Sequence, residues 1–274
     1  NPYNFYCQSI LRLRKLNPLV FDDSARVNGI LTHYVLEALG KKFPEGALPN
    51  NSAEIVKQIA TKIYEPLSDH KDYPRIMRRW HEIIPMILRF ERTSRSDFPI
   101  IHVEINGELI VALGNKTIKL TGRTDRIGVS RIGALQIVDY KTGTLPRVKE
   151  VTDMRKPQLT ILTLIATKGV YPDWDKLPAP RKVESLQAWK ISAQNDKRTS
   201  YMPKKKDSSL DDWLSESYDM LVQIIAHMHD PDNGFPSTSS VPQQSDQFIH
   251  DDYALLARAC EWGRIDGQKD NEND

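Results

Sequence analysis

The spacing of apolar residues changes near residue 98, and this change constrains the fold more than any other feature. Before it, apolar side chains recur every three or four residues, as in amphipathic helices; after it come the β-branched residues and alternation of strands. The expected helices are 25–39, 51–63 and 73–88, and the expected strands are 99–105, 108–113, 116–122 and 134–140. Helices at 154–167 and 209–228 then flank a strand at 183–191. This order predicts an α/β fold with a central mixed sheet and helices on both sides.

Composition excludes two classes of protein. The chain has 274 residues, enough to bury roughly three quarters of the surface that it exposes when unfolded. Hydrophobic residues make up 39% and charged residues 27%, and no window approaches the ~18 apolar residues of a membrane span. A membrane protein and a wholly disordered chain are therefore excluded. The net charge of +2 does not by itself indicate a polyanionic partner.

The cysteines and the ends of the chain indicate its setting. Cys7 and Cys260 are too few for a disulfide framework, which favours a reducing, cytoplasmic location. The chain begins at Asn1 without Met or an apolar leader, so we expect a fragment of a longer protein. The polar residues from about 267 onward are expected to be disordered.

Local signals predict turns and loops between these elements. Asn106-Gly107 is a strong hairpin signal, and Gly114-Asn115 predicts a second turn. Pro85 is expected to kink its helix, and the basic run from Lys197 to Lys206 is expected to be a loop.

Asp139 and Lys141 form the chemically most informative pair. They are two residues apart on an expected strand, so both point to one face, ~6.6 Å apart along the strand. Such a carboxylate holds a hard divalent cation, while the lysine orients a water and offsets developing negative charge. Pairing across a turn at 130–133 would bring Asp125 beside Asp139, and a cation between them would remove their repulsion.

A simpler interpretation of the same residues stays open at this point. Asp125 would form an ion pair with Arg123 or Arg126, and Asp139 with Lys141 would be a surface ion pair. Spacing alone does not decide between a metal site and ordinary ion pairs.

The order of these residues resembles the RecB-like branch of the PD-(D/E)xK nuclease superfamily. The segments that carry the likeness are GRTDRI (122–127), IVDYKTG (137–143) and PQL (157–159). NPYNFY (1–6), Gly29 with His33, and 253–262 are similar to the C-terminal nuclease domains of the AddB family, from alphaproteobacterial AddAB helicase–nucleases. The resemblance implies the RecB-like nuclease fold, in one domain over 1–274. It comprises a mainly helical part at 1–95, a catalytic sheet core at 96–192, and C-terminal helices and a loop at 193–274.

The resemblance also implies roles for individual residues. The expected ligands of Mg²⁺ or Mn²⁺ are His33, Asp125, Asp139 and the backbone carbonyl of Tyr140. Asp125 and Asp139 count as catalytic, together with Lys141 as the catalytic lysine and Gln158 near the active centre. Without the resemblance, His33 would be interpreted as an ordinary surface or capped helical histidine.

Two positions depart from the family pattern or stay open. Leu162 stands where RecB-like nucleases often have Tyr. Glu104 is either an outer-shell acid or a solvated strand residue.

Many such domains hold an iron–sulfur cluster on four cysteines, and two cysteines cannot supply four thiolates, so no cluster is expected. Contacts to the DNA backbone are expected from basic residues, each of which is otherwise a solvated surface charge. The candidates are Arg75, Arg78, Arg79, Lys149, Arg155 and Lys156.

Together these observations predict a metal-dependent DNA exonuclease domain. The resemblance implies single-stranded DNA delivered by a helicase, an AddA-type helicase subunit as partner, and a role in double-strand break repair. The alternatives are a non-catalytic DNA-binding scaffold that retains the nuclease fold, and a Cas4-like or phage-type exonuclease.

Overall fold

The computed structural model describes residues 2–14, 24–172, 174, 181–192, 197–201, 209–230, 232–235, 253 and 256. They belong to two compact units, one of Asn1–Asp22 with Gln223–Asp274 and the other of Asp23–Val222. Cys260 and the predicted disordered tail lie outside the described residues. Among the described residues, no helix is long and apolar enough to cross a membrane.

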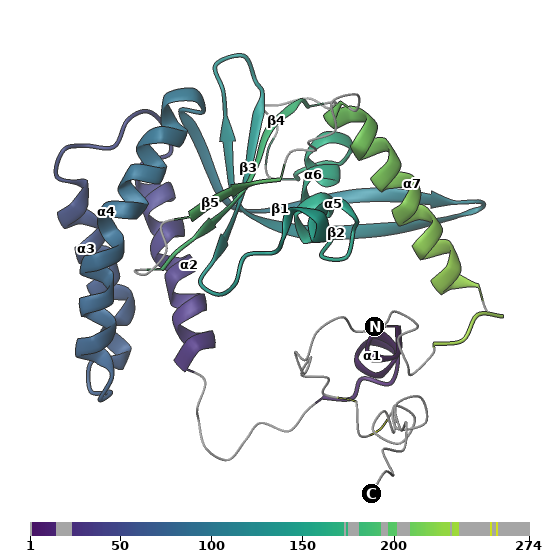
Figure 1. Cartoon of the computed structure of the whole chain (residues 1–274), viewed down its shortest axis with the longest axis horizontal. Coiled ribbons are helices and arrows are strands. Elements are labelled where there is room, and N and C mark those ends of the chain that lie inside the picture. The colour runs from purple at the N-terminus through teal and green to yellow at the C-terminus, as the bar shows by residue number, and fades with distance from the viewer. Residues whose placement is uncertain are drawn as a thin grey trace, which may run out of the picture. The chain divides into compact units, whose positions relative to one another are not determined.

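The larger unit is built on a five-stranded mixed sheet in the order β1-β2-β3-β4-β5 (Figure 1). The strands are β1 (Ile100–Leu113), β2 (Lys116–Val129), β3 (Leu135–Lys141), β4 (Val183–Lys190) and β5 (Lys197–Ser200). Only β3 and β4 run parallel, and the other neighbours are antiparallel. The predicted mixed sheet is therefore confirmed.

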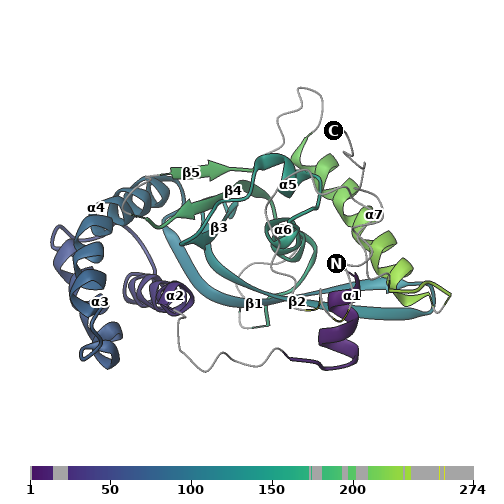
Figure 2. The same ribbon diagram turned by 60° about the horizontal axis from the view of Figure 1, so that its bottom comes forward.

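Helices cover both faces of this sheet, as predicted. The sheet curves around α6 (Gln158–Lys168), while α2, α3 and α4 lie on its outer side (Figure 2). These three helices are Ser24–Lys42, Ser52–Tyr64 and Tyr73–Asp97, and they share one buried apolar core with Val138, Tyr140 and Trp189 of the sheet. α5 (Val148–Thr152) precedes α6, and Trp213 at the start of α7 (Leu210–His229) donates to the Thr152 carbonyl at 3.2 Å.

The predicted hairpin turn at Asn106-Gly107 is wrong, because both residues lie within β1. Gly107 serves close packing instead: a Cβ there would clash with Ile165 of α6 and with Tyr171. The turn between β1 and β2 is at Gly114-Asn115, as predicted, and Gly114 adopts a φ of +58°.

Other strand boundaries also differ from the predicted ones. β2 continues from the predicted end at 122 to Val129, so Asp125 lies inside this strand rather than beyond its end. Lys197–Ser200 was predicted as loop but pairs with β4 as β5, where the Arg198 guanidinium lies 5.1 Å from the centre of the Phe90 ring. Among the helices, α4 continues through Pro85 and past its predicted end at residue 88, as far as Asp97.

The smaller unit joins residues from both ends of the chain. It contains α1 (Pro2–Phe5) and the π-helical turn Tyr6–Ile10. The ring centres of Phe5 and Tyr6 lie 6.1 and 5.3 Å from that of Phe235, and the Tyr253 hydroxyl donates to the Leu13 carbonyl at 2.8 Å. Within this unit Cys7 is a buried free thiol.

Candidate metal centre

An irregularity in the β1–β2 ladder positions the first acidic residues. The register runs without a shift from Ile100↔Val129 to Leu113↔Lys116, and Glu104 with Asp125 is the one level at which the pairing is interrupted. Glu104 has a φ of +53°, a left-handed conformation that costs a non-glycine residue of order 1–3 kcal/mol. The backbone is therefore strained at Glu104, and the ladder is interrupted where Glu104 and Asp125 would pair.

Two glycines show that the regular alternation of side chains between the two faces of β2 is broken at this level. Gly122 and Gly128 are six residues apart, so a regular strand would point both to the same face. A Cβ at Gly122 would instead meet Leu162 of α6, and one at Gly128 would meet Phe98, beside the end of α4 on the outer side of the sheet. Asp125 lies between them, at this break.

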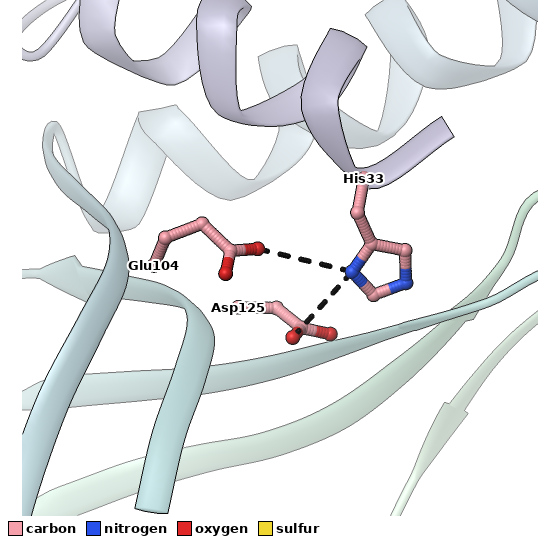
Figure 3. A group of neighbouring side chains, drawn as sticks. All are labelled: His33, Glu104 and Asp125. Atoms are coloured by element: carbon pink, nitrogen blue, oxygen red, sulfur yellow. Dashed lines mark ion pairs between the residues drawn. The ribbon is translucent and has the colours of Figure 1, made fainter. Parts of the chain in front are cut away.

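The irregularity brings Glu104 and Asp125 to His33, which α2 supplies (Figure 3). His33 Nδ1 lies 3.8 Å from Glu104 Oε1 and 3.6 Å from Asp125 Oδ1. One potential ligand atom from each of the three residues lies within 4.8 Å of the others. Glu104 is 6% exposed, so the alternative of a solvated strand residue is wrong.

The other nitrogen of His33 is engaged with the backbone. Nε2 lies 3.2 Å from the Tyr140 carbonyl, which can only accept, so Nε2 carries the proton in this contact. Deprotonated at Nδ1, the ring would present a lone pair there to a cation beside the two carboxylates, the usual arrangement of a metal-bound histidine. The Tyr140 carbonyl, predicted as a ligand, here accepts from His33 and retains one further lone pair.

Asp139, Lys141 and Gln158 form a closed hydrogen-bonded triangle next to this group. Lys141 Nζ lies 3.0 and 2.9 Å from the two carboxylate oxygens of Asp139 and donates to Gln158 Oε1 at 2.9 Å. Gln158 Nε2 donates to Asp139 Oδ1 at 2.9 Å. Asp139 is 1% exposed, so its contact with Lys141 is not the simple surface ion pair of the alternative interpretation.

Asp125 lies level with Asp139 in the sheet. The β2–β3 ladder ends at Arg126↔Val138, and the next position in that register pairs Asp125 with Asp139, as the predicted antiparallel pairing requires. The Tyr140 N–H donates to Asp125 Oδ2 at 2.7 Å. The alternative partners of Asp125 are engaged elsewhere: Arg123 contacts Glu104 at 2.7 Å and Arg126 contacts Glu91 at 3.0 Å.

Burial and like charge make this cluster unfavourable without a cation. Burial, with the charges of Asp139 and Glu104, raises the pKa of Asp125 to about 6 against the opposing effect of His33. Burial also raises the pKa of Asp139, although Lys141 opposes it. Burial disfavours charge on His33, but Glu104 and Asp125 outweigh it and raise its pKa. The cluster thus favours an added positive charge.

The residues present fit a hard divalent ion. An imidazole nitrogen with carboxylate and carbonyl oxygens is a donor set that suits Mg²⁺ or Mn²⁺, whereas structural Zn²⁺ sites use four protein ligands rich in Cys and His. The closest group differs from the predicted one in containing Glu104 in place of Asp139. Asp139 lies at the next position of the sheet and is held by Lys141 and Gln158.

The predicted DNA-binding residues fall into two groups. Arg75, Arg78 and Arg79 lie on α4, and Lys149, Arg155 and Lys156 lie in α5 and just before α6. Lys156 pairs with Glu150 at 3.4 Å, and Arg155 lies 3.9 Å from Asp153. The second group is closer in sequence to Gln158, the first residue of α6, whereas α4 is on the outer side of the sheet (Figure 2).

Two further arrangements were not predicted from the sequence. Arg123 forms an ion pair with Glu104, and Arg126 is fully buried against Glu91 of α4, with Arg95 on the same carboxylate at 2.8 Å. In the sequence, these two ion pairs are indicated only by the position of Arg123 and Arg126 on either side of Asp125 in GRTDRI.

The chain is similar in sequence to one family of known proteins and to several bacterial relatives. A family model described as the PD-(D/E)XK nuclease superfamily matches residues 1–242. An uncharacterized protein of Rickettsia typhi is 32% identical over 174 residues, and one of Rickettsia bellii is 29% identical over 170 residues. Each match covers 60% of this chain and 20% of the relative, so the chain spans about a fifth of the length of these relatives. The solved structure of SSO0001 aligns with a TM-score of 0.29 and 16% identity, over 71% of this chain and 88% of that one.

Proposed function

The chain belongs to the PD-(D/E)XK nuclease superfamily, whose members are typically metal-dependent nucleases, and we infer that this domain hydrolyses DNA phosphodiesters with a divalent cation. One observation carries this inference. Residues far apart in the sequence, from His33 on α2 to Gln158 on α6, meet around Asp125 and Asp139. A non-catalytic scaffold needs no such convergence of a buried carboxylate, a lysine and an amide.

His33, Glu104 and Asp125 would hold Mg²⁺ or Mn²⁺, with Asp139 and the Tyr140 carbonyl beside them. When bound, the ion supplies Lewis-acid activation of the phosphoryl oxygen and of water. The protein's own contribution is to fix the donors: Tyr140 N–H orients Asp125, and the Tyr140 carbonyl orients His33.

Lys141 and Gln158 act on the attacking water and on the phosphate. The side chain of Lys141 is 30% exposed and its ammonium contacts Asp139, so it can donate to a water and balance negative charge that develops on the phosphoryl oxygens. Gln158 accepts from Lys141 and donates to Asp139, which holds both groups in one orientation.

The substrate and setting follow from the resemblance to the AddB family. We propose a single-stranded DNA exonuclease that processes double-strand breaks beside an AddA-type helicase subunit in the cytoplasm. Support comes from the motif order around His33, Asp139 and Gln158 and from the basic residues before α6. The curated relatives are about five times the length of the matched part, which leaves room for further domains.

The test is cleavage of end-labelled single-stranded DNA by the full-length protein, with Mg²⁺, with Mn²⁺ and with EDTA. Cleavage with either ion and none with EDTA is expected, with shortening from one end if the enzyme is an exonuclease. DNA binding without cleavage under all conditions would favour the scaffold. Labels at the 5′ and 3′ ends in turn assign the polarity.

A further inference from the structure

The ion pair between Glu104 and Arg123 has no role in the chemistry described above. Arg123 Nε lies 2.7 Å from Glu104 Oε2, while Glu104 Oε1 faces His33. The Glu104 side chain is 6% exposed, but that of Arg123 is 60% exposed. The Glu104 carboxylate thus lies between the metal centre and the solvent-exposed guanidinium of Arg123.

The position of Arg123 relative to the metal centre is well defined. Arg123 precedes Asp125 by two residues on β2, which places it ~7 Å along the strand. Glu104 lies between the guanidinium and the metal centre, because its Oε2 contacts Arg123 Nε at 2.7 Å and its Oε1 faces His33 Nδ1 at 3.8 Å. A phosphate bound by this guanidinium would therefore lie beside a phosphate at the metal centre.

A guanidinium in this position suits a phosphate. It carries five N–H donors in a planar fork, and its contact with Glu104 Oε2 is an ion pair without hydrogen-bond geometry, so N–H donors are available to pair with two oxygens of one phosphate. A surface lysine gives no such bidentate geometry. The strain at Glu104 is the kind of backbone feature that persists at functional sites.

We propose that Arg123 binds the backbone phosphate next to the scissile one, and that Glu104 is the positioning residue that orients it. This inference rests on the proposed nuclease function and adds to it a phosphate-binding subsite. The ligand is a phosphodiester of the nucleic acid backbone, and no base is recognised at this point.

The chain offers a closely matched control in Lys119. Lys119 pairs with Glu108 at 2.8 Å on the same two strands, and Lys119 is 54% exposed. The two pairs correspond in register: Glu108 pairs with Thr121, the same register would pair Glu104 with Asp125, and in each case the basic residue lies two positions earlier on β2. The Lys119 pair is four residues further toward the hairpin tip, ~13 Å from the first pair.

The first experiment measures binding of a single-stranded oligonucleotide by fluorescence anisotropy, in EDTA, at several salt concentrations. Arg123→Ala in the full-length protein should weaken binding about tenfold, the effect of losing a charge-assisted hydrogen bond. It should also reduce the slope of log K against log salt by about 0.7, as one lost phosphate contact requires. Arg123→Lys should recover the slope but not the full affinity, and Lys119→Ala should stay within about twofold of wild type.

The second experiment locates the phosphate. Oligonucleotides with one neutral methylphosphonate linkage, moved stepwise along the strand, are cleaved by wild type and by Arg123→Ala in Mg²⁺. Wild type should be slowed by a neutral linkage next to the scissile bond, and Arg123→Ala should be insensitive at that same linkage. Lys119→Ala should show the wild-type pattern.

Three results would overturn the proposal. Equal affinity, salt slope and linkage sensitivity in wild type and Arg123→Ala would remove Arg123 from the substrate site while leaving the nuclease function intact. A loss of Mn²⁺ affinity in Arg123→Ala that accounts for its whole defect would mean that Arg123 acts on Glu104 alone. A wild-type protein that neither binds nor cleaves DNA would instead refute the proposed function itself, and this inference with it.

Discussion

At the scale of single residues, the contacts among Asp139, Lys141 and Gln158 indicate that Lys141 contributes more to catalysis than to the stability of the fold. Asp139 is almost completely buried, whereas Lys141 at the end of β3 is 30% exposed. Each of the three side chains contacts the other two. Gln158 therefore continues to donate to Asp139 if the lysine is removed, and the carboxylate retains one partner.

We predict that Lys141→Ala reduces cleavage about a hundredfold to a thousandfold, the usual effect of removing one charge-stabilising donor. The free energy of unfolding should fall by no more than about 1–2 kcal/mol, because Gln158 still satisfies Asp139. The measurements are single-turnover cleavage rates and denaturant titrations. Lys182→Ala, which removes an exposed lysine paired with Glu184, is the control and should leave both unchanged. Undiminished cleavage in Lys141→Ala would remove its catalytic assignment.

At the scale of elements, a buried cluster of charged side chains holds α4 against the sheet, next in sequence to Asp125. Glu91 of α4 contacts Arg126 of β2 at 3.0 Å and Arg95 at 2.8 Å, and all three side chains are at most 4% exposed. Arg126 also donates to Gln136 of β3 at 3.0 Å and lies 5.0 Å from the ring centre of Trp189 in β4. The cluster thus contacts β2, which carries Asp125, and the next two strands of the sheet, β3 and β4.

Glu91→Gln should lower the free energy of unfolding by about 3–5 kcal/mol, because it leaves two buried guanidinium groups without their carboxylate. Glu184→Gln is the control, since Glu184 pairs with exposed Lys182 and its loss should cost less than about 1 kcal/mol. Denaturant titrations give both values. Equal effects of the two substitutions would show that the cluster does not stabilise the fold.

The same cluster predicts how stability depends on pH. Burial opposes the charge of Glu91, but Arg126 and Arg95 outweigh it and hold the pKa of Glu91 below its ordinary value. The unfolded chain therefore takes up this proton at a higher pH than the folded chain. The stability that Glu91 contributes is complete above about pH 4.3, its ordinary pKa, and is lost as the pH falls through the folded pKa. The stability difference between wild type and Glu91→Gln should shrink on acidification, and a constant difference would contradict this.

The contact between β1 and α6 gives a second prediction at this scale. Gly107→Ala places a methyl group against Ile165 and Tyr171, so it should lower the free energy of unfolding by about 1–3 kcal/mol through overpacking. Gly143→Ala is the control, because nothing lies within 4 Å of a Cβ there. Thermal melts compare the two. A neutral Gly107→Ala would mean that α6 can shift away from the hairpin.

At the scale of the whole molecule, part of the centre could be predicted from sequence and part could not. The two-residue spacing of Asp139 and Lys141 and the antiparallel pairing of Asp125 are local consequences of strand geometry, so their pattern was sufficient. The position of Glu104 depends on one left-handed residue within a strand, which no local pattern indicates.

Long-range packing accounts for the remaining differences. Gly107 follows Asn106 and gives a turn signal, but α6, more than 50 residues later in the sequence, requires a glycine there for close packing. The contact of Arg126 with Glu91 spans 35 residues and two elements, and it becomes evident only when α4 lies on the sheet. Both cases depend on tertiary contacts that a local pattern does not contain.

The central claim is that His33 and the acidic residues of β1, β2 and β3 hold a divalent cation. The most direct test is a titration of the full-length protein with Mn²⁺, in which electron paramagnetic resonance reports the free ion, for wild type and for Asp125→Asn. We predict that wild type binds Mn²⁺ at this centre and that Asp125→Asn binds it at least tenfold more weakly, since even residues behind the ligands change affinity by about 10–100-fold. Failure of wild type to bind Mn²⁺, or equal affinity in the two proteins, would contradict the account.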